Sequence, residues 1–298
     1  MLQKSDYEAL VYSYDETLGV KRMRRGEYPL DAPIDRILHY MDKHDIQYII
    51  DGDWQYAAKI ESIQAKPYIL YSQWNKELLN LPLLAIVGPR SMSSYAKRVL
   101  DELFPILSLY NVWTISWAAI GVDTYVHALS LRYAIPTVAV LGGWLAHYHQ
   151  TSQRAFLSSL VQAGGLLISE YPLRKKPEVY TFPARNRIIA WLASVVFVPE
   201  AGEKSWSLIT VDFAHQRKKP IYAVMWDIFS STSAGTNMFI EQWRIVPLQS
   251  IGSFLEKHFT LKVWGSPKKV SSPMQENKPT YASPSEMFVA HSLEELGL

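Results

Sequence analysis

The run Gly88-Pro89-Arg90-Ser91 combines the chemistry needed to hold an anion. It follows the apolar segment 83–87 and precedes a helical pattern in which Ser93 or Ser94 is the expected N-cap. A glycine at a strand end lets the backbone approach a ligand, and the free N–H groups of a helix start attract phosphate. Arg90 would add a forked cation. The run therefore predicts a phosphate-binding turn, with a purely structural turn as the alternative.

A second candidate is Arg185-Asn186-Arg187, which the pattern places at the start of a helix whose next turn is apolar. Arginine at a helix N-terminus opposes the macrodipole, so two arginines there indicate a nearby anion. The alternative is that they pair with acids such as Glu170 or Glu200.

Hydroxyl side chains mark a third strand end. Ser205, Ser207 and Thr210 stand at the start of the helical pattern 207–216, directly after the apolar run 195–198. Hydroxyls and unbonded amides there would form a second phosphate cradle. Plain helix capping explains the same residues.

Catalytic and metal-binding patterns are weak. His147 and His149 fit a loop pair, Asp123 fits a helix N-cap, and Ser116 lacks a Gly-x-Ser-x-Gly setting. The sequence has no cysteine, no GxGxxG and no Walker A motif. We therefore expect no catalytic residue, no metal and no cofactor.

Six β-rich runs alternate with helical patterns and would position these side chains. The runs are 83–87, 112–116, 137–141, 166–169, 195–198 and 221–224. Several are continuously apolar, which is typical of strands covered on both faces. The pattern predicts a doubly wound, mostly parallel α/β sheet whose ligands bind at the C-terminal strand ends, in the loops after 87, 116, 141, 169 and 198.

The chain divides into three parts. Residues 1–80 are expected to hold a small helical element and an extended lead-in, 81–252 the core, and 253–298 a Pro/Ser/Lys-rich linker and a short tail. The 298 residues carry a net charge of +2, so a nucleic-acid surface would be a local patch. No apolar run suits a membrane span or a signal peptide, which predicts a cytoplasmic protein.

Taken in order, seven segments resemble the DNA-processing protein A family, also called DprA or Smf, over about residues 44 to 250. The segments are IVGPR (86–90), SWAAIGVD (116–123) followed by His127, VAVLGGWL (138–145), LLISEYP (166–172), FPARNRIIA (182–190), PEAGEKSWSLIT (199–210) and GTN (235–237) followed by Phe239 and Ile240. Seven collinear matches are far more specific than any one of them. The resemblance implies an extended Rossmann-like core.

The resemblance also implies a role in natural transformation. Family members bind incoming single-stranded DNA, protect it and help to load the RecA recombinase onto it during recombination. The DNA-binding residues carried over by motif are Gly88, Pro89, Arg90, Ser91, Ser116, Arg185, Asn186, Arg187, Ser205, Ser207 and Thr210. Homodimerisation stays open. The family's arginine in SWAAIGVD is Ile120 here, so one cation of the patch is missing, and a full winged-helix domain is not expected in 285–298.

A different class of protein remains as the alternative. Nucleotide-binding relatives of the fold, such as the "Lonely guy" phosphoribohydrolases, carry a Pro-Gly-Gly-x-Gly-Thr-x-x-Glu loop. This chain has PEAGEKSWSLITVD at the matching strand end and lacks that glutamate.

Seven tryptophans fall where members of that family usually have glycine. They are Trp74, Trp117, Trp144, Trp191, Trp206, Trp226 and Trp243. One explanation is a gene that reads UGA as glycine, translated as if UGA meant tryptophan; glycine is scarce, at 14 residues. The other is a divergent protein whose aromatic rings stack on bases.

Overall fold

The computed structural model describes residue 10 and residues 34–50, 66–74, 76–148, 153–171 and 181–262. Residues 263–298 of the predicted linker and tail and residue His149 lie outside the described residues, as do the side chains of Trp74 and His147, whereas the first residues of that predicted linker belong to a helix, Ile251–His258. Within these ranges, no helix combines the length and the apolar character needed to cross a membrane.

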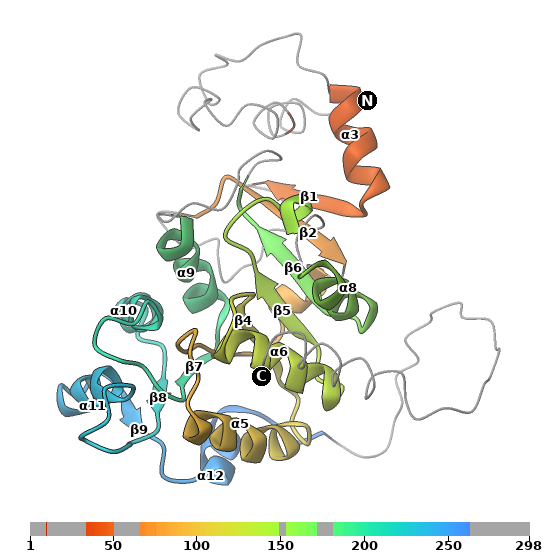
Figure 1. Cartoon of the computed structure of the whole chain (residues 1–298). Helices are drawn as coiled ribbons and strands as arrows, with labels where there is room; N and C mark the ends of the chain where they lie inside the picture. Colours follow the sequence, from red (N-terminus) through yellow and green to blue (C-terminus); the bar gives the residue numbers. More distant parts are fainter. Residues whose placement is uncertain are drawn as a thin grey trace.

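A nine-stranded sheet in the order β1-β2-β6-β5-β4-β3-β7-β8-β9 forms the centre of the molecule (Figure 1). The six predicted strands are confirmed and run parallel: β3 Leu83–Ile86, β4 Trp113–Trp117, β5 Thr137–Val140, β6 Leu166–Ser169, β7 Val195–Val198 and β8 Ile221–Ala223. The short β9 (Val246–Pro247) pairs parallel with β8. The predicted lead-in supplies β1 (Ile46–Ile50) and β2 (Ile69–Trp74), an antiparallel pair beside β6.

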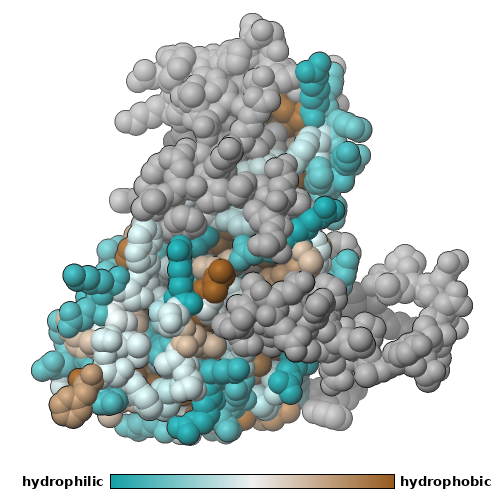
Figure 2. Space-filling view, in the orientation of Figure 1, coloured by the Kyte–Doolittle hydropathy of each residue, from teal (hydrophilic) through white to brown (hydrophobic). Residues whose placement is uncertain are grey.

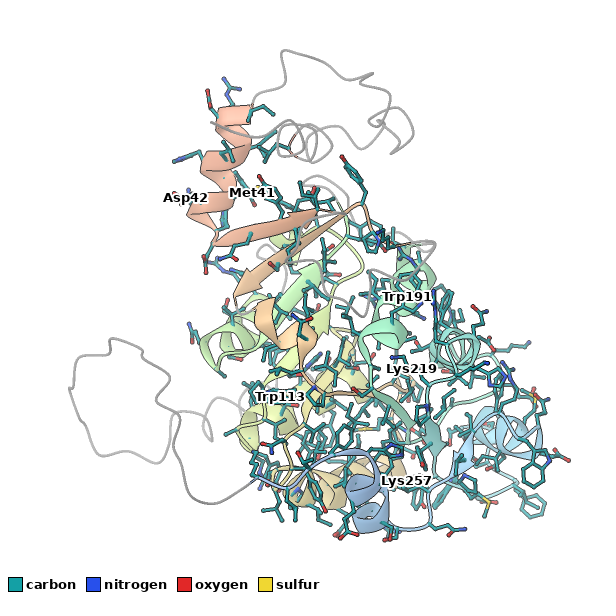
Figure 3. All side chains as sticks on the ribbon, turned by 180° about the vertical axis from the view of Figure 1, so that it is seen from behind. Met41, Asp42, Trp113, Trp191, Lys219 and Lys257 are labelled. Carbon is teal, nitrogen blue, oxygen red and sulfur yellow. The ribbon has the colours of Figure 1, made fainter. Side chains whose placement is uncertain are left out.

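Helices cover both faces of this sheet, so the doubly wound α/β architecture is confirmed. The helices are α3 Ile34–Lys43, α5 Ser94–Leu107, α6 Val122–Arg132, α7 Leu145–Tyr148, α8 Arg154–Gln162, α9 Thr181–Leu192, α10 Ser207–Gln216, α11 Ala234–Glu241 and α12 Ile251–His258, with a 3₁₀ turn η1 at Lys76–Asn80. Seen from behind, Met41 on α3 and Lys257 on α12 mark opposite ends of the molecule (Figure 3).

The two faces of β3 show how the sequence builds the core. Leu83 and Ala85 point into a cluster with α9 and α10, whereas Leu84 and Ile86 point into a cluster with α5, α6 and α12. Alternate residues of a strand face opposite sides, so a strand buried on both sides must be apolar throughout. This explains the continuous apolar runs, and it directs the polar residues to the loops at the strand ends.

Candidate nucleic-acid interface

A cavity of about 890 Å³ opens where the parallel strands β3, β4 and β7 end. Its wall is formed by residues 88–91, Trp117, Arg185, residues 202–207, Ser231, Thr232 and Ala234. Three of the predicted site segments therefore meet at one place, whereas no described residue of the predicted loops after β5 and β6 is among these lining residues. The wall carries the cationic side chains of Arg90, Arg185 and Lys204.

The loop after β3 is packed tightly against the start of α6. A Cβ atom on Gly88 would lie 2.5 Å from Cγ2 of Val122, and a Cβ on Gly121 would lie 2.4 Å from the carbonyl oxygens of Pro89 and Arg90. Gly121, the N-cap of α6, has φ +102°, a backbone conformation that favours glycine. The N–H of Val122 donates to the Pro89 carbonyl over 3.2 Å. Close packing thus fixes the loop, while Arg90 at its tip is exposed.

A protein carboxylate lies at the start of α5, where the sequence predicted N–H groups for a phosphate. Ser93 is the N-cap, and its hydroxyl accepts from the N–H of Ala96 over 3.1 Å. The buried Glu200 carboxylate accepts from the Ser93 N–H over 2.7 Å and from the Ser93 hydroxyl over 2.5 Å. A carboxylate already holds the place that an anion would take at this helix start.

Arg185 lies in the cavity wall although its side chain is only 3% exposed. Its guanidinium carbon lies 5.0 Å from the ring centroid of Trp117, and the guanidinium bonds the Tyr148 hydroxyl. Burial lowers the pKa of Arg185, while Tyr148 and Asp123 oppose that shift. Arginine side chains keep their proton in folded proteins. The structure therefore holds a fixed cation at the wall.

Ser116 and Asp123 form a buried support beneath the first loop rather than a part of the cavity wall. The Ser116 hydroxyl lies 2.6 Å from the Ile86 carbonyl oxygen and 2.8 Å from Oδ1 of Asp123. The Asp123 carboxyl also accepts from the N–H of Gly88. The sequence predicted Asp123 as a helix N-cap. This prediction is wrong, because the N-cap of α6 is Gly121.

The carboxyl group of Asp123 titrates close to neutral pH. Burial raises the pKa of Asp123 to about 7, against the Ser116 hydrogen bond and the nearby guanidinium of Arg185. A hydroxyl has one proton, so Ser116 cannot donate to both the Ile86 carbonyl and Asp123 at once. The carboxylic acid form of Asp123 would satisfy both contacts by donating to Ser116.

His127 supports the neighbouring strand end. Its Nε2 lies 2.7 Å from the Trp117 carbonyl oxygen, and its Nδ1 lies 2.8 Å from the Thr137 hydroxyl. Burial lowers the pKa of His127 to about 4, so the ring is neutral at physiological pH. It holds the backbone of Trp117 at the cavity wall.

Arg185, Asn186 and Arg187 have three different environments. The helix α9 begins at Thr181, four residues before Arg185, so these side chains do not stand at the helix start as predicted. Arg187 forms an ion pair with Glu170, which is the alternative considered from the sequence. The Asn186 amide is buried and donates to the Trp206 carbonyl over 3.2 Å. Of the three residues, Arg185 alone lines the cavity.

The hydroxyl segment after β7 is also divided. Ser205 and Ser207 line the cavity, with their hydroxyl oxygens 3.2 Å apart. The N-cap of α10 is Trp206, whose side chain makes no capping hydrogen bond. Thr210 is fully buried and does not line the cavity, and its hydroxyl has no hydrogen-bond partner in the described structure.

Several lining residues were not predicted from the sequence. Lys204 lies in the strand-end loop 199–207 and could have been found by the same argument as Ser205. Ser231 and Thr232 follow β8, a strand whose C-terminal loop was not among the predicted ones. Among the described residues, no group of three His, Asp or Glu side chains is arranged to hold a metal ion.

The tryptophans whose side chains are described occupy contrasting places. Trp144 and Trp191 are buried, and Trp117 is buried with its indole N–H lacking a hydrogen-bond partner. Trp243 is 95% exposed and has φ +58° at the end of α11, where its N–H bonds the Ile240 carbonyl. Helices usually end in this way with glycine. The backbone at Trp243 therefore fits glycine, while the packed indoles fit genuine tryptophan.

The amino-acid sequence is similar to those of several known proteins. Protein Smf of Escherichia coli is 33% identical over 200 residues, which cover 67% of this chain and 54% of that protein. DNA processing protein DprA of Bacillus subtilis is 30% identical over 208 residues, or 70% of each chain. This chain thus spans about half the length of the Escherichia coli relative.

Two solved structures share the fold. DNA processing protein A of Helicobacter pylori, studied for its single-stranded DNA binding mode, aligns with a TM-score of 0.63 and 26% identity over 71% of this chain and 95% of that chain. DprA of Streptococcus pneumoniae aligns with a TM-score of 0.69 and 23% identity over 88% and 99%. The family model for DNA recombination-mediator protein A matches residues 47–257. With the sheet, the strand-end cavity and this match over most of its length, the chain belongs to the DNA recombination-mediator protein A family, the DprA/Smf family.

Proposed function

We propose that the cavity binds single-stranded DNA and that the protein brings the bound strand to a RecA-type recombinase during natural transformation, without catalysing a reaction. Membership of the DNA recombination-mediator protein A family supports this role. The observation that carries the finer proposal is the convergence of Arg90, Arg185 and Lys204, from three separate segments, on one cavity.

The chemistry of the cavity suits a single strand. Arginine and lysine side chains hold backbone phosphates, which every nucleotide carries. A strand with unpaired bases can bend into a cavity at a sheet edge, whereas a paired duplex is stiff. Binding should therefore be tolerant of sequence and should weaken steeply with salt. The Helicobacter pylori relative binds the same class of ligand, single-stranded DNA.

The sequence after β7 argues against the phosphoribohydrolase alternative. The segment PEAGEKSWSLITVD lacks the glutamate of the Pro-Gly-Gly-x-Gly-Thr-x-x-Glu loop that this alternative requires. The same proposal places the protein in the cytoplasm with no membrane partner, and it leaves homodimerisation open.

The test compares oligothymidine with a duplex of equal length by fluorescence anisotropy, using the matched variants Arg185→Lys and Arg187→Lys. Lysine keeps the charge beside Asp123 but loses the fork of arginine. We expect the single strand to bind more tightly, Arg185→Lys to weaken binding several-fold, and Arg187→Lys to bind like the wild type. Tighter duplex binding, or unchanged affinity in Arg185→Lys, would contradict the proposal. Weaker binding in both variants would mean that Arg187 also contributes to DNA binding.

A further inference from the structure

The loop between β8 and α11, residues 224–233, exposes three large apolar side chains. Met225 is 62% exposed, Ile228 79% and Phe229 90%. Figure 2 shows hydrophobic surface at the lower left margin of the molecule, where Figure 1 places α11. Apolar groups gathered on a surface mark an interaction site more often than a chance exposure.

Hydrogen bonds hold this loop in shape. The Asn237 side chain bonds the backbone N–H of Trp226 over 3.4 Å and its carbonyl over 3.0 Å. Oδ1 of Asp227 accepts from the N–H of Phe229 over 2.9 Å, and the Ser233 hydroxyl donates to the Asp227 carbonyl over 2.8 Å. The exposed side chains therefore belong to a loop whose backbone is held by hydrogen bonds.

The loop continues directly into the cavity wall. Ser231 and Thr232 line the cavity, and the N–H of Thr236 donates to the Ala201 carbonyl over 3.1 Å. Phe229 and Ser231 are two positions apart in the chain, so their Cα atoms are at most about 7 Å apart. A strand that leaves the cavity past Ser231 reaches Phe229 next.

Cations border the same loop. The rings of Trp226 and Tyr95 stack with centroids 3.5 Å apart, and the guanidinium carbon of Arg98 lies 5.6 Å from the Tyr95 centroid. Arg98 and its neighbour Lys97 are exposed on α5. Asp227 is the acid within the loop, and one of its carboxylate oxygens accepts from the Phe229 N–H. Exposed aromatic groups beside cations are the surface that single-stranded nucleic acid prefers.

We propose that single-stranded DNA leaving the cavity stacks its next base on Phe229, against Ile228, with its backbone phosphate beside Arg98. This rests on the proposed function, because it extends the path of the same strand. The loop would lengthen the site, so its contribution should appear only with oligonucleotides long enough to cover both the cavity and the loop.

The experiment titrates wild type, Phe229→Ala, Phe229→Trp and the control Leu109→Ala with oligothymidines of about four and about sixteen nucleotides. Leu109 is also an exposed apolar residue but follows the C-terminal end of α5, away from the cavity. We expect Phe229→Ala to lose roughly tenfold in affinity for the long strand and nothing for the short one, and Phe229→Trp and Leu109→Ala to match the wild type.

Each other outcome overturns a defined claim. If the wild type binds the long strand and Phe229→Ala binds it equally well, the path over the loop is wrong while the cavity proposal stands. If Phe229→Ala instead loses self-association in light scattering with unchanged DNA affinity, the loop binds a second copy of the chain. If the wild type binds no single strand, both proposals fall.

Discussion

The loops after β3 and β7 lie side by side at one edge of the sheet, yet they meet the cavity in different ways. Both combine glycine, serine and a helix start. The β3 loop packs Gly88 against Val122, and Ser93, the N-cap of the helix after it, donates to Glu200. The β7 loop leaves Glu203 and Lys204 exposed at the cavity.

The difference shows that two loops of similar sequence can use their polar groups differently. One loop bonds its polar groups to the protein itself, and the other exposes them at the cavity. In the first loop the backbone N–H of Ser93 donates to a protein carboxylate, and Arg90 is the exposed cation that the loop offers to a phosphate. The second loop presents side chains directly. Glu200 joins the two, because it follows β7 and bonds Ser93 beside β3.

Replacing Glu200 with glutamine should lower the free energy of unfolding by about 3 kcal/mol, since a buried carboxylate accepting two hydrogen bonds is lost. Urea denaturation measures the change. Glu203→Gln is the matched control and should leave stability unchanged, because Glu203 is exposed. Equal stability of Glu200→Gln and the wild type would show that the contact between Glu200 and Ser93 does not stabilise the protein. The proposed difference between the two loops would then be wrong.

The free energy of unfolding should fall as pH rises from about 4 to about 7, because folded Asp123 keeps a proton that the unfolded chain has released. Between pH 5 and pH 8 the loss should be roughly 2 kcal/mol relative to Asp123→Asn, which carries no titrating group. Urea midpoints of both proteins at the two pH values give the comparison. Parallel pH profiles would mean that Asp123 is ionised throughout.

Trp206→Gly should tighten binding of oligothymidine roughly tenfold, equivalent to 1.4 kcal/mol, because the indole stands in the cavity wall between Ser205 and Ser207. Anisotropy titration decides the sign. Weaker binding after the substitution would show that the indole stacks on bases, and would favour genuine tryptophans over the glycine-codon explanation.

Trp243→Gly should raise the free energy of unfolding by about 1 kcal/mol, because φ +58° strains a residue with a Cβ atom. Gln242→Gly, one position earlier at φ −78°, is the control and should lower stability. Urea denaturation of the three proteins suffices. A loss of stability in Trp243→Gly would show that its indole makes contacts worth more than the strain.

Much of the fold could be predicted from the sequence, because strands buried on both faces leave continuous apolar runs such as VVFV at 195–198. The convergence of the site segments also followed, since parallel strands end at one edge. The side-chain roles did not follow. Arg185 and Arg187 are two positions apart on α9, and side chains at that spacing point in different directions, so one lines the cavity and the other pairs with Glu170.

Contacts between distant segments account for the other differences. The bond between Glu200 and Ser93 joins residues 107 positions apart, and nothing in either local pattern indicates it. The start of α9 was missed because the apolar pattern begins at Ile188, while Pro183 lies in the first turn, where proline is tolerated.

The salt dependence of single-strand binding tests the central claim most directly. We compare the wild type, the Arg90→Ala/Lys204→Ala double variant and Arg132→Ala, a control at the far end of α6, in oligothymidine titrations over a range of salt concentrations. If the exposed cavity cations hold phosphates, the slope of log affinity against log salt should become smaller by about two in the double variant and stay unchanged in Arg132→Ala. An unchanged slope in the double variant would show that the DNA binds elsewhere.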